Sequence, residues 1–578
     1  MSDGTGNGWK PTRRQLVGTG MAALAAVQAG PVLAAPAIAG RKRPNILFVM
    51  TDQERSATTL PSGLDLPAHE WIGERGTFFA KYNVNTTPCS PSRSVAYFGR
   101  HTQQTDMVVN DGAPPFPRLN GKLRSIGHHL RDLGYYTAYK GKWHLSDIPH
   151  AAQLGYGPYI KTDRSLEPFG FSDYNIDGDP HGKVWDGYRY DGPTVSSAIQ
   201  WLDEVARKLP AEQPWFLAVN LVNPHDICFF ESWQGQTATR GNPDVLSPLA
   251  PAPASEIYDR DWSDVPLPAS FYRKPAEGEP WAVNSYRKVC DLTYGAMPDD
   301  ERVWRRNQSY YFNCIRDASY KVRRLFSALE TLGLADDTIV VLTADHGEMA
   351  GAQRLRQKGP VIFKENVAVP LYISHPDARK ARTTDSLGST VDLLPTLFEF
   401  AGGNPGELED PLGKLPGVSL ANALTGGRTE RDERGAFYNY GVPFYIDPQM
   451  IEGMMRSART PSAWAMLIES LKLGHLGPSR TNRGLHRGVF DGRYKFARFF
   501  GLGEHHMPRD WETLRAHNDL ALYDTQTDPD ELHNLALEPE AHKDLILALN
   551  AKTNALIETE VGRDEGQEFV GPGWLYRL

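Results

Sequence analysis

Three short runs of apolar residues, spaced widely along the chain, predict buried strands. They cover residues 45–50 (NILFVM), 215–222 (WFLAVNLV) and 338–343 (TIVVLT). Such runs, short and almost without polar residues, are typical of parallel strands covered on both faces. Between them, residues 123–135 and 320–336 repeat apolar positions every three or four residues, which predicts helices. The alternation predicts an α/β fold with a mostly parallel sheet flanked by helices.

Polar residues follow each of these runs directly. Asp52 and Gln53 come after the first, His225 after the second, and Asp345 and His346 after the third. Ligands of α/β proteins bind at the carboxyl ends of parallel strands, so these side chains are expected to share a site. Carboxylate, amide and imidazole groups are ligands of divalent cations, which makes a metal site one hypothesis. Each aspartate taken singly also fits a turn or a helix cap.

The last quarter of the chain differs in amino-acid composition and in the elements it predicts. Residues 401–435 are rich in Gly and Pro, which places a boundary close to Gly426. Downstream, Asp491-Gly492 between apolar stretches predicts a hairpin, and residues 545–561 predict a closing helix. We therefore expect a catalytic domain over residues 40–426 and a small antiparallel-sheet and helix subdomain over 427–578. Residues 229–302, rich in Pro, Trp and Ser, are expected to be an insertion over the site.

Composition and charge narrow the range of functions. The chain is 40% hydrophobic and 23% charged, near the average of globular proteins, which argues against disorder and a multi-span membrane protein. A net charge of −8 argues against a surface that binds nucleic acid. Four cysteines in 578 residues exclude a disulfide-dense scaffold. Small molecules or neutral glycans are the expected partners.

The first 39 residues resemble an export signal. Lys10, Arg13 and Arg14 precede a weakly apolar stretch rich in Gly and Ala, and the segment around the arginine pair resembles a twin-arginine signal. The stretch is less apolar than a membrane-spanning helix requires, so we expect a removable signal and a mature chain without a membrane span. The protein would then be periplasmic or secreted. A disordered basic tail is the alternative interpretation.

The sequence Cys89-Ser90-Pro91-Ser92-Arg93 is the most specific local signal. A thiol followed at two and four residues by proline and arginine is a poor fit to a helix or a strand, and a buried cysteine before a turn is the simplest interpretation. The pattern also resembles the C-x-P-x-R motif of the formylglycine-dependent sulfatases of the alkaline phosphatase superfamily. The resemblance extends, in the family's order, over residues 41–560, through the segments GYYTAYKGKWHL from Gly134, NPHD from Asn223, VVLTADHGE and ALYDTQTDPDELHNLA from Ala521.

This resemblance implies a fold and a metal site. The fold would be an alkaline-phosphatase-like, mostly parallel sheet with helices. The residues expected to hold one divalent metal are Asp52, Gln53, Cys89, Asp345 and His346. In the commonest sulfatase pattern Gln53 would be Asp and His346 would be Asn, so this chain looks closer to the choline-sulfatase and phosphonate-monoester-hydrolase branch. The imidazole and the missing carboxylate make Mn²⁺ a candidate beside Ca²⁺.

The resemblance also implies a nucleophile. Cys89 would be oxidised by a formylglycine-generating enzyme to an aldehyde (3-oxoalanine), which hydrates to a gem-diol. One hydroxyl would attack sulfur, and the other would later expel sulfate, an exit that serine lacks. Arg93 would stabilise the ionised hydrate.

Further residues take roles from the family motifs. Lys142 would contact the sulfuryl group, and His144 would be the base that collapses the hemiacetal; strand alternation is expected to point both side chains to the same side of an extended segment. His225 and Lys358 would protonate and contact the leaving group. Asn110 would contact a sulfuryl or leaving-group oxygen.

Together these features predict a sulfatase that cleaves a small sulfate monoester, such as an aryl, choline or sugar sulfate. The Lys142 and His144 pair favours this over a phosphonate monoester or phosphodiester hydrolase on the same scaffold, since the phosphonate hydrolases lack the pair. A non-catalytic protein that binds sulfated glycans is the alternative from another class. The other cysteines, Cys228, Cys290 and Cys314, allow at most one disulfide.

Overall fold

The first apolar run forms an inner strand of the main sheet. In the computed structural model, β1 (Asn45–Asp52) pairs in parallel with β4 (Trp215–Pro224) on one side and with β5 (Thr338–Ala344) on the other. Every residue of the three strands is buried. The prediction of three buried parallel strands is confirmed.

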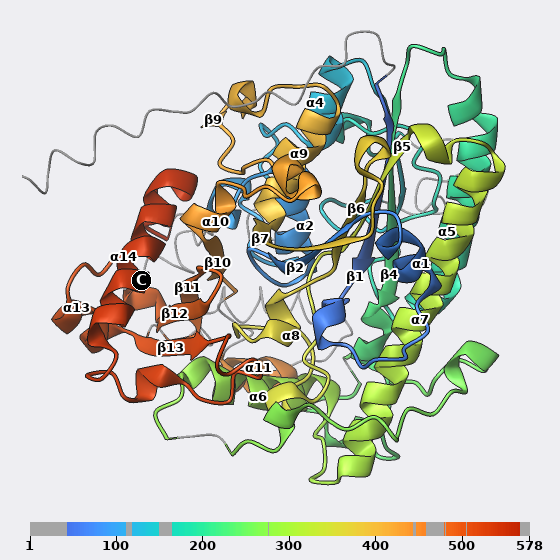
Figure 1. The fold of residues 1–578 in the computed structure, drawn as a ribbon. Coiled ribbons are helices and arrows are strands. Elements are labelled where there is room, and N and C mark those ends of the chain that lie inside the picture. The colour runs from blue at the N-terminus through green and yellow to red at the C-terminus, as the bar shows by residue number, and fades with distance from the viewer. Residues whose placement is uncertain are drawn as a thin grey trace, which may run out of the picture. The chain divides into compact units, whose positions relative to one another are not determined.

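These strands belong to a seven-stranded sheet with the order β3-β4-β1-β5-β6-β2-β7 (Figure 1). β6 runs antiparallel to both of its neighbours, and the other pairs are parallel. The predicted mostly parallel sheet is therefore confirmed. The four outer strands are β2 (Thr77–Asn83), β3 (Tyr136–Gly141), β6 (Leu371–Ser374) and β7 (Arg382–Ser389).

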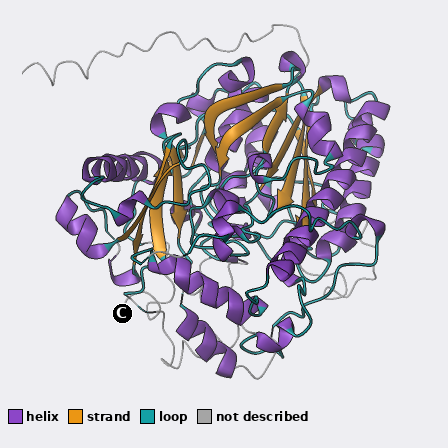
Figure 2. Cartoon of the chain, turned by 60° about the horizontal axis from the view of Figure 1, so that its bottom comes forward, coloured by secondary structure: helices purple, strands orange, loops and turns teal. Residues whose placement is uncertain are grey.

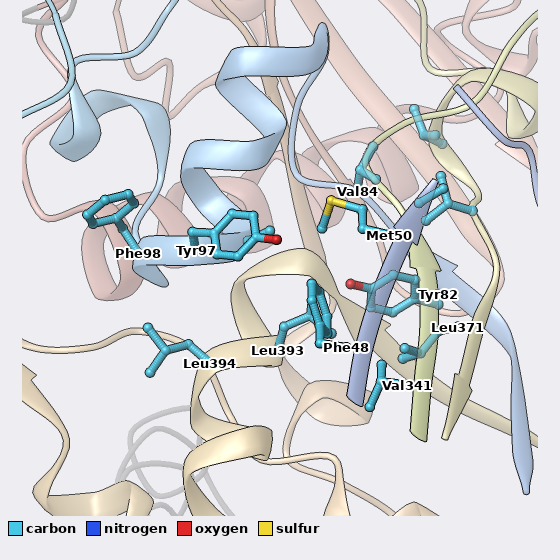
Figure 3. Packing of buried hydrophobic residues seen from close by; sticks show 14 of the residues in the cluster. Phe48, Met50, Tyr82, Val84, Tyr97, Phe98, Val341, Leu371, Leu393 and Leu394 are labelled. Atoms are coloured by element: carbon cyan, nitrogen blue, oxygen red, sulfur yellow. The ribbon is translucent and has the colours of Figure 1, made fainter. Parts of the chain in front are cut away.

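Helices cover both faces of this sheet, as the alternating side chains of β1 require. Ile46, Phe48 and Met50 pack against α2 (Cys89–Phe98), α4 (Ile126–Asp132) and α9 (Leu393–Phe400), and Figure 3 shows Phe48 beside Tyr97 and Leu393 in this core. Leu47 and Val49 point the other way, toward α1 (Pro67–Gly73), α5 (Asp186–Glu204) and α7 (Glu301–Thr331). Strand periodicity alone produces two cores on the two faces of one sheet.

The two predicted helices exist but differ in length from the prediction. α4 begins only at Ile126, because the Ser125 hydroxyl accepts hydrogen bonds from the backbone N–H groups of Gly127 and His128 and so caps the helix. α7 begins at Glu301, nineteen residues before the predicted start at Tyr320. Its first half buries aromatic residues against the 229–302 segment, which is a tertiary contact that the repeat of aliphatic positions did not signal.

The segment 229–302 has its own packing. It contains α6 (Trp281–Tyr294), and its buried Phe230, Tyr258 and Trp262 form a cluster with Tyr310 of α7. The α6 residue Tyr286 donates a hydrogen bond to the carbonyl of Lys358 over 2.5 Å, which brings α6 to the loop after β5.

The C-terminal part forms a second sheet, visible in Figure 2 as a separate group of strands. It is antiparallel in the order β10 (Ala436–Tyr440), β11 (Leu485–Phe490), β12 (Tyr494–Phe500) and β13 (Asp519–Asp524). The predicted hairpin at Asp491-Gly492 joins β11 to β12, and the predicted closing helix is α14 (Lys543–Leu556), which packs on the sheet. The small antiparallel-sheet and helix subdomain is confirmed.

The remaining short elements connect these parts. They are α3 (Thr102–Thr105), α8 (Lys364–Val367), α10 (Arg431–Arg434), α11 (Pro448–Ser457), α13 (Trp511–His517), β8 (Glu409–Asp410) and β9 (Gly413–Lys414).

The structure describes residues 43–110, 118–148, 164–244, 246–274, 277–442, 447–457, 479, 481–504 and 506–566. The expected export segment, residues 1–39, lies outside them. Arg43–Leu578 forms one unit by its contacts, and the boundary near Gly426 stays a prediction. Within the described ranges, no helix has the length and apolar character needed to cross a membrane.

A buried ion-pair network connects residues near the seven-stranded sheet with residues near the C-terminal sheet. Arg431 lies 2.6 Å from Asp392, which precedes α9, and 2.5 Å from Glu560, which follows α14, and all three side chains are fully buried. His101 lies 3.0 Å from the same Glu560 carboxylate. Burial acts to raise the pKa of Glu560, but Arg431 and His101 outweigh it and lower the pKa below its ordinary value.

We expect Arg431→Ala to lower the free energy of unfolding by about 3–5 kcal/mol, because it removes the guanidinium that pairs with both buried carboxylates. Urea unfolding followed by fluorescence measures this. Arg509→Ala, which breaks the exposed Arg509–Glu558 pair, is the matched control and should change stability by less than about 1 kcal/mol. The contribution of Glu560 should be full at neutral pH and decline as the pH falls through its lowered folded-state pKa. Equal effects of the two substitutions would contradict the role given to Arg431.

Candidate active site

The predicted site residues meet at the carboxyl ends of the central strands. Asp52 is the last residue of β1, Asp345 and His346 follow β5, and His225 follows β4. Cys89, from a distant part of the chain, is the first residue of α2 and lies among them. The strand ends thus bring together residues that are up to 294 positions apart in the sequence.

Four of these residues form a cluster suited to a metal ion. One ligand atom each of Asp52, Cys89, Asp345 and His346 lies within 4.8 Å of the others, and all four residues are buried. Cys89 Sγ is 3.1 Å from His346 Nε2 and 3.6 Å from Asp52 Oδ1. Two carboxylates and an imidazole converging in a buried space fit a divalent cation, because these groups are its usual ligands.

Two cations balance the carboxylates of this cluster. Arg93 Nε is 2.8 Å from Asp345 Oδ2, and Lys142 Nζ is 2.5 Å from Asp52 Oδ2. Arg93 also reaches Asp52 at 3.4 Å, and all four side chains are fully buried. Burial acts to raise the pKa of Asp52, but Lys142, His225 and Arg93 hold it well below the ordinary value. Asp52 is therefore ionised at neutral pH.

Gln53 has a different set of partners. Its backbone takes a left-handed conformation (φ 71°), and its N–H donates to Asp345 Oδ1 over 3.1 Å. The side-chain amide donates to Glu348 and Gln357, so its oxygen faces Lys358 and Cys228, from both of which it accepts. The structure therefore places Gln53 at the edge of the cluster, and its role as a metal ligand stays a prediction.

The expectation that the C-x-P-x-R segment is a poor helix is wrong. Cys89 to Phe98 form α2, with Pro91 in the first turn, where a backbone N–H has no helical partner and its absence costs nothing. The helical spacing of four residues places Arg93 on the same side as Cys89. Ser92 Oγ donates to the carbonyl of Asp345, which ties the first turn of α2 to the end of β5. The positive end of the helix dipole thus faces residue 89.

The expectation of an extended segment through Lys142 and His144 is also wrong. β3 ends at Gly141, which has φ 91°, and only glycine fits there because a Cβ would collide with the carbonyl oxygen of Asn220. His144 has φ 58°, so strand alternation does not apply to it. Lys142 still reaches Asp52, and the buried His144 ring stacks on His181 with centroids 5.3 Å apart.

The remaining predicted residues surround this cluster. His225 is buried, with Nε2 3.8 Å from Cys228 Sγ, and burial together with Lys358 and Lys142 lowers its pKa well below the ordinary value. Lys358 Nζ contacts Gln53 and lies 3.3 Å from Cys228 Sγ. Asn110 Oδ1 accepts the backbone N–H of Ser90 over 3.0 Å, at the start of α2.

Other residues of the site were not predicted. Asn220 on β4 accepts hydrogen bonds from Arg93 and Tyr97, and Glu348 accepts from the backbone N–H of Gln357. Cys228 lies three residues after His225, and this spacing on a short helical turn is the one signal that could have pointed to it. All four cysteines are free and buried, so no disulfide forms among Cys228, Cys290 and Cys314.

The fold and the buried cluster define an α/β protein with a candidate metal site beside a cysteine at a helix N-terminus. A family model described as Sulfatase matches residues 44–403. The chain belongs to the sulfatase family, in the alkaline phosphatase superfamily, and is an enzyme that hydrolyses sulfate esters.

Several characterised proteins are similar over most of the chain. The Delta 4,5-hexuronate-2-O-sulfatase of Bacteroides thetaiotaomicron is 24% identical over 93% of this chain and 92% of its own. The choline-sulfatase of Rhizobium meliloti is 27% identical over 68% of this chain and 73% of its own. Among solved structures, a 2-O GAG sulfatase has a TM-score of 0.63 at 21% identity, covering 90% of this chain and 93% of its own. The phosphonate monoester hydrolase of Agrobacterium radiobacter has a TM-score of 0.58 at 20% identity, covering 90% and 97%.

Proposed function

We propose that this enzyme cleaves a sulfate monoester with a hydrated formylglycine made from Cys89. The observation that carries the proposal is the position of Cys89 Sγ, 3.1 Å from His346 and 3.6 Å from Asp52, with Arg93 and Lys142 paired to the carboxylates around it. A nucleophile placed there attacks next to the groups that can neutralise the charge of a sulfuryl group.

The reaction balances in two halves. In the first, one hydroxyl of the residue 89 hydrate gives its proton to water, the resulting oxyanion bonds to sulfur, the sulfur–oxygen bond to the alcohol breaks, and the alcohol oxygen receives a proton from His225. In the second, His144 removes the proton of the remaining hydroxyl, the carbon–oxygen bond to sulfate breaks, and the electron pair leaves with sulfate as the carbonyl reforms. Water then restores the hydrate. Both histidines work by proton transfer at a positioned ring nitrogen.

The residues of the cluster would hold one divalent cation through Asp52, Asp345, His346 and residue 89, with Gln53 as a further candidate. When bound, the cation withdraws negative charge from the sulfuryl oxygens. Ca²⁺ and Mn²⁺ are both candidates, and the imidazole of His346 makes Mn²⁺ the better match to the donor set. Because Arg93 and Lys142 already balance the two carboxylates, the charge of the cation remains available to the sulfate group.

The leaving-group side of the site would be formed by His225, Lys358 and Asn110. The lowered pKa of His225 follows from burial and from two nearby lysines, and an anionic substrate between these groups would favour the protonated imidazole. Lys358 supplies a fixed positive charge for the ester oxygen. Asn110, bonded to the start of α2, would donate its amide N–H to a substrate oxygen.

We propose further that residues 1–39 direct export by the twin-arginine route, to the periplasm or the outside. A formylglycine-generating enzyme would then be the partner during maturation, acting on the Cys89 segment. The arginine pair at 13–14 and the small-residue stretch after it support this proposal.

The first test is mass spectrometry of the tryptic peptide that contains residue 89. We expect an aldehyde, trapped by a hydrazide reagent, in place of the thiol, and a fraction of aldehyde that scales with specific activity. Fully active enzyme with an alkylatable thiol at Cys89 would contradict the proposal.

Turnover of a substrate panel separates the candidate functions. The panel contains choline sulfate, aryl sulfates, sulfated sugars including 2-O-sulfated unsaturated uronates, and aryl phosphonate monoesters. The names of the relatives suggest the sugar and choline esters, whereas Gln53 and His346 suggest the phosphonates. We expect sulfate esters to dominate because Lys142 and His144 are present. Phosphonate dominance would favour the hydrolase alternative, and glycan binding without any turnover would favour a binding protein.

A further inference from the structure

One short loop segment, Asp179-Pro180-His181-Gly182, contacts three of the proposed catalytic side chains. The segment lies between β3 and α5, and it is separated in sequence from all three of these side chains. None of its residues carries a proposed role in the reaction. Its contacts reach Lys142, His144 and His225 separately.

The first contact holds the backbone of His144. The two carboxylate oxygens of Asp179 accept the N–H of Trp143 over 3.0 Å and the N–H of His144 over 2.7 Å. His144 has φ 58°. Residues other than glycine rarely adopt this left-handed backbone conformation unless their surroundings hold them in it. The Asp179 carboxylate supplies that restraint, because its two oxygens accept hydrogen bonds from two consecutive backbone N–H groups of this turn.

The second contact involves His181. Its carbonyl accepts a hydrogen bond from Lys142 Nζ over 2.8 Å, and its ring stacks on the His144 ring with an interplanar angle of 18°. Its Nδ1 lies 2.8 Å from the carbonyl of Asp179 and must donate there, since a carbonyl only accepts. The ring is thereby held against His144.

The third contact places Gly182 against His225. A Cβ on Gly182 would lie 2.5 Å from both Nδ1 and Cε1 of the His225 ring, so only glycine permits the backbone to approach this face. Gly182 and Lys183 donate their N–H groups to Asp186 at the start of α5, which anchors the segment.

We propose that Asp179–Gly182 positions the proton-transfer groups of both half-reactions, Asp179 through His144 and Gly182 through His225. This inference rests on the proposed two-half mechanism. Asp179 and His181 act through other residues and are positioning residues, not catalytic ones. Disturbing Asp179 should slow the release of sulfate from residue 89, whereas disturbing Gly182 should slow the departure of the alcohol.

The test compares Asp179→Ala with Gly182→Ala, both normalised to the aldehyde content of residue 89. For Asp179→Ala we expect kcat to fall about 10²-fold, because a base displaced by about 1 Å loses that much. KM should fall by a similar factor and kcat/KM should stay near the wild-type value, since kcat/KM reports the step that releases alcohol. A burst of one alcohol per aldehyde site should precede the slow phase.

For Gly182→Ala we expect the opposite pattern. kcat/KM should fall, more steeply for alkyl than for nitrophenyl sulfates, because good leaving groups need less help from His225, and no burst should form.

Asp179→Asn retains one oxygen acceptor and should give an intermediate loss of kcat. Asp177→Ala, an exposed aspartate of the same loop, is the matched control and should behave as wild type.

Unchanged kcat in Asp179→Ala, or a parallel loss of kcat and kcat/KM without a burst, would overturn the inference. A purely structural role would lower burst size and rate together. Failure of the proposed function is distinguishable, because it would appear in the wild type as absent aldehyde or absent sulfate turnover.

Discussion

Cys89→Ser is expected to give an enzyme that releases one alcohol per molecule and then stops. The serine hydroxyl occupies the position of Cys89 Sγ, beside His346 and Asp52, and so remains placed to attack sulfur. It has no second hydroxyl on the same carbon, so the sulfate ester on residue 89 has no route of collapse. Cys89→Ala, which has no oxygen at all, should lose activity by about 10⁴-fold or more.

Two measurements check this result. Alcohol release is counted per protein molecule, and mass spectrometry shows whether the peptide containing residue 89 retains a sulfate group. Cys314→Ala is the matched control, because Cys314 is a buried thiol in α7 that the proposed reaction does not use, and its turnover per molecule should be preserved. Repeated turnover by Cys89→Ser would contradict the two-hydroxyl mechanism.

Chelation of the metal is expected to abolish turnover while the fold remains intact. Loss of a cation that stabilises the transition state by several kcal/mol should reduce the rate by about 10³-fold or more. The fold should survive because Lys142 and Arg93 already pair with Asp52 and Asp345 at 2.5 and 2.8 Å, so the carboxylates are not left uncompensated. Activity, metal content and thermal unfolding are measured before and after chelation, and then after addition of Ca²⁺ or Mn²⁺.

Lys142→Met sharpens the metal experiment. In this variant Asp52 loses its closest cation, so chelation should lower the unfolding temperature far more than in the wild type, and added metal should restore it. The readout is stability, which is independent of the effect of the substitution on catalysis. Unfolding of the wild type on chelation would show that the metal, and not the two cations, balances the carboxylates.

The central sheet was predictable because its signal is local. The runs that became β1, β4 and β5 are short and apolar, which is typical of strands buried on both faces. The same locality made Asp52, Asp345 and His225 visible, since a polar residue at the end of a buried strand lies at the ligand-binding edge. The hairpin at Asp491-Gly492 was equally local, because the turn needs residues of that type.

The errors arose where distant residues set the backbone. Cys89-Ser90-Pro91 begins a helix because its first turn is tied to Asp345, and Gly141 turns the chain because the Asn220 carbonyl occupies the space beside it. The sequence near Cys89 and Gly141 does not predict either contact. For the same reason the early start of α7, which depends on packing against the 229–302 segment, was missed.

The sequence by itself determined the fold class, because the periodicity of its apolar residues is local, and it indicated the family and the site residues through the resemblance of its motifs to those of the sulfatases. Only the tertiary structure decided the pairing of Arg93 and Lys142 with the two carboxylates, the partners of Gln53, and the approach of Asp179–Gly182 to the three side chains for which we propose catalytic roles. These are long-range contacts, and their geometry depends on how strands and loops from tens to hundreds of residues apart meet at one edge of a sheet.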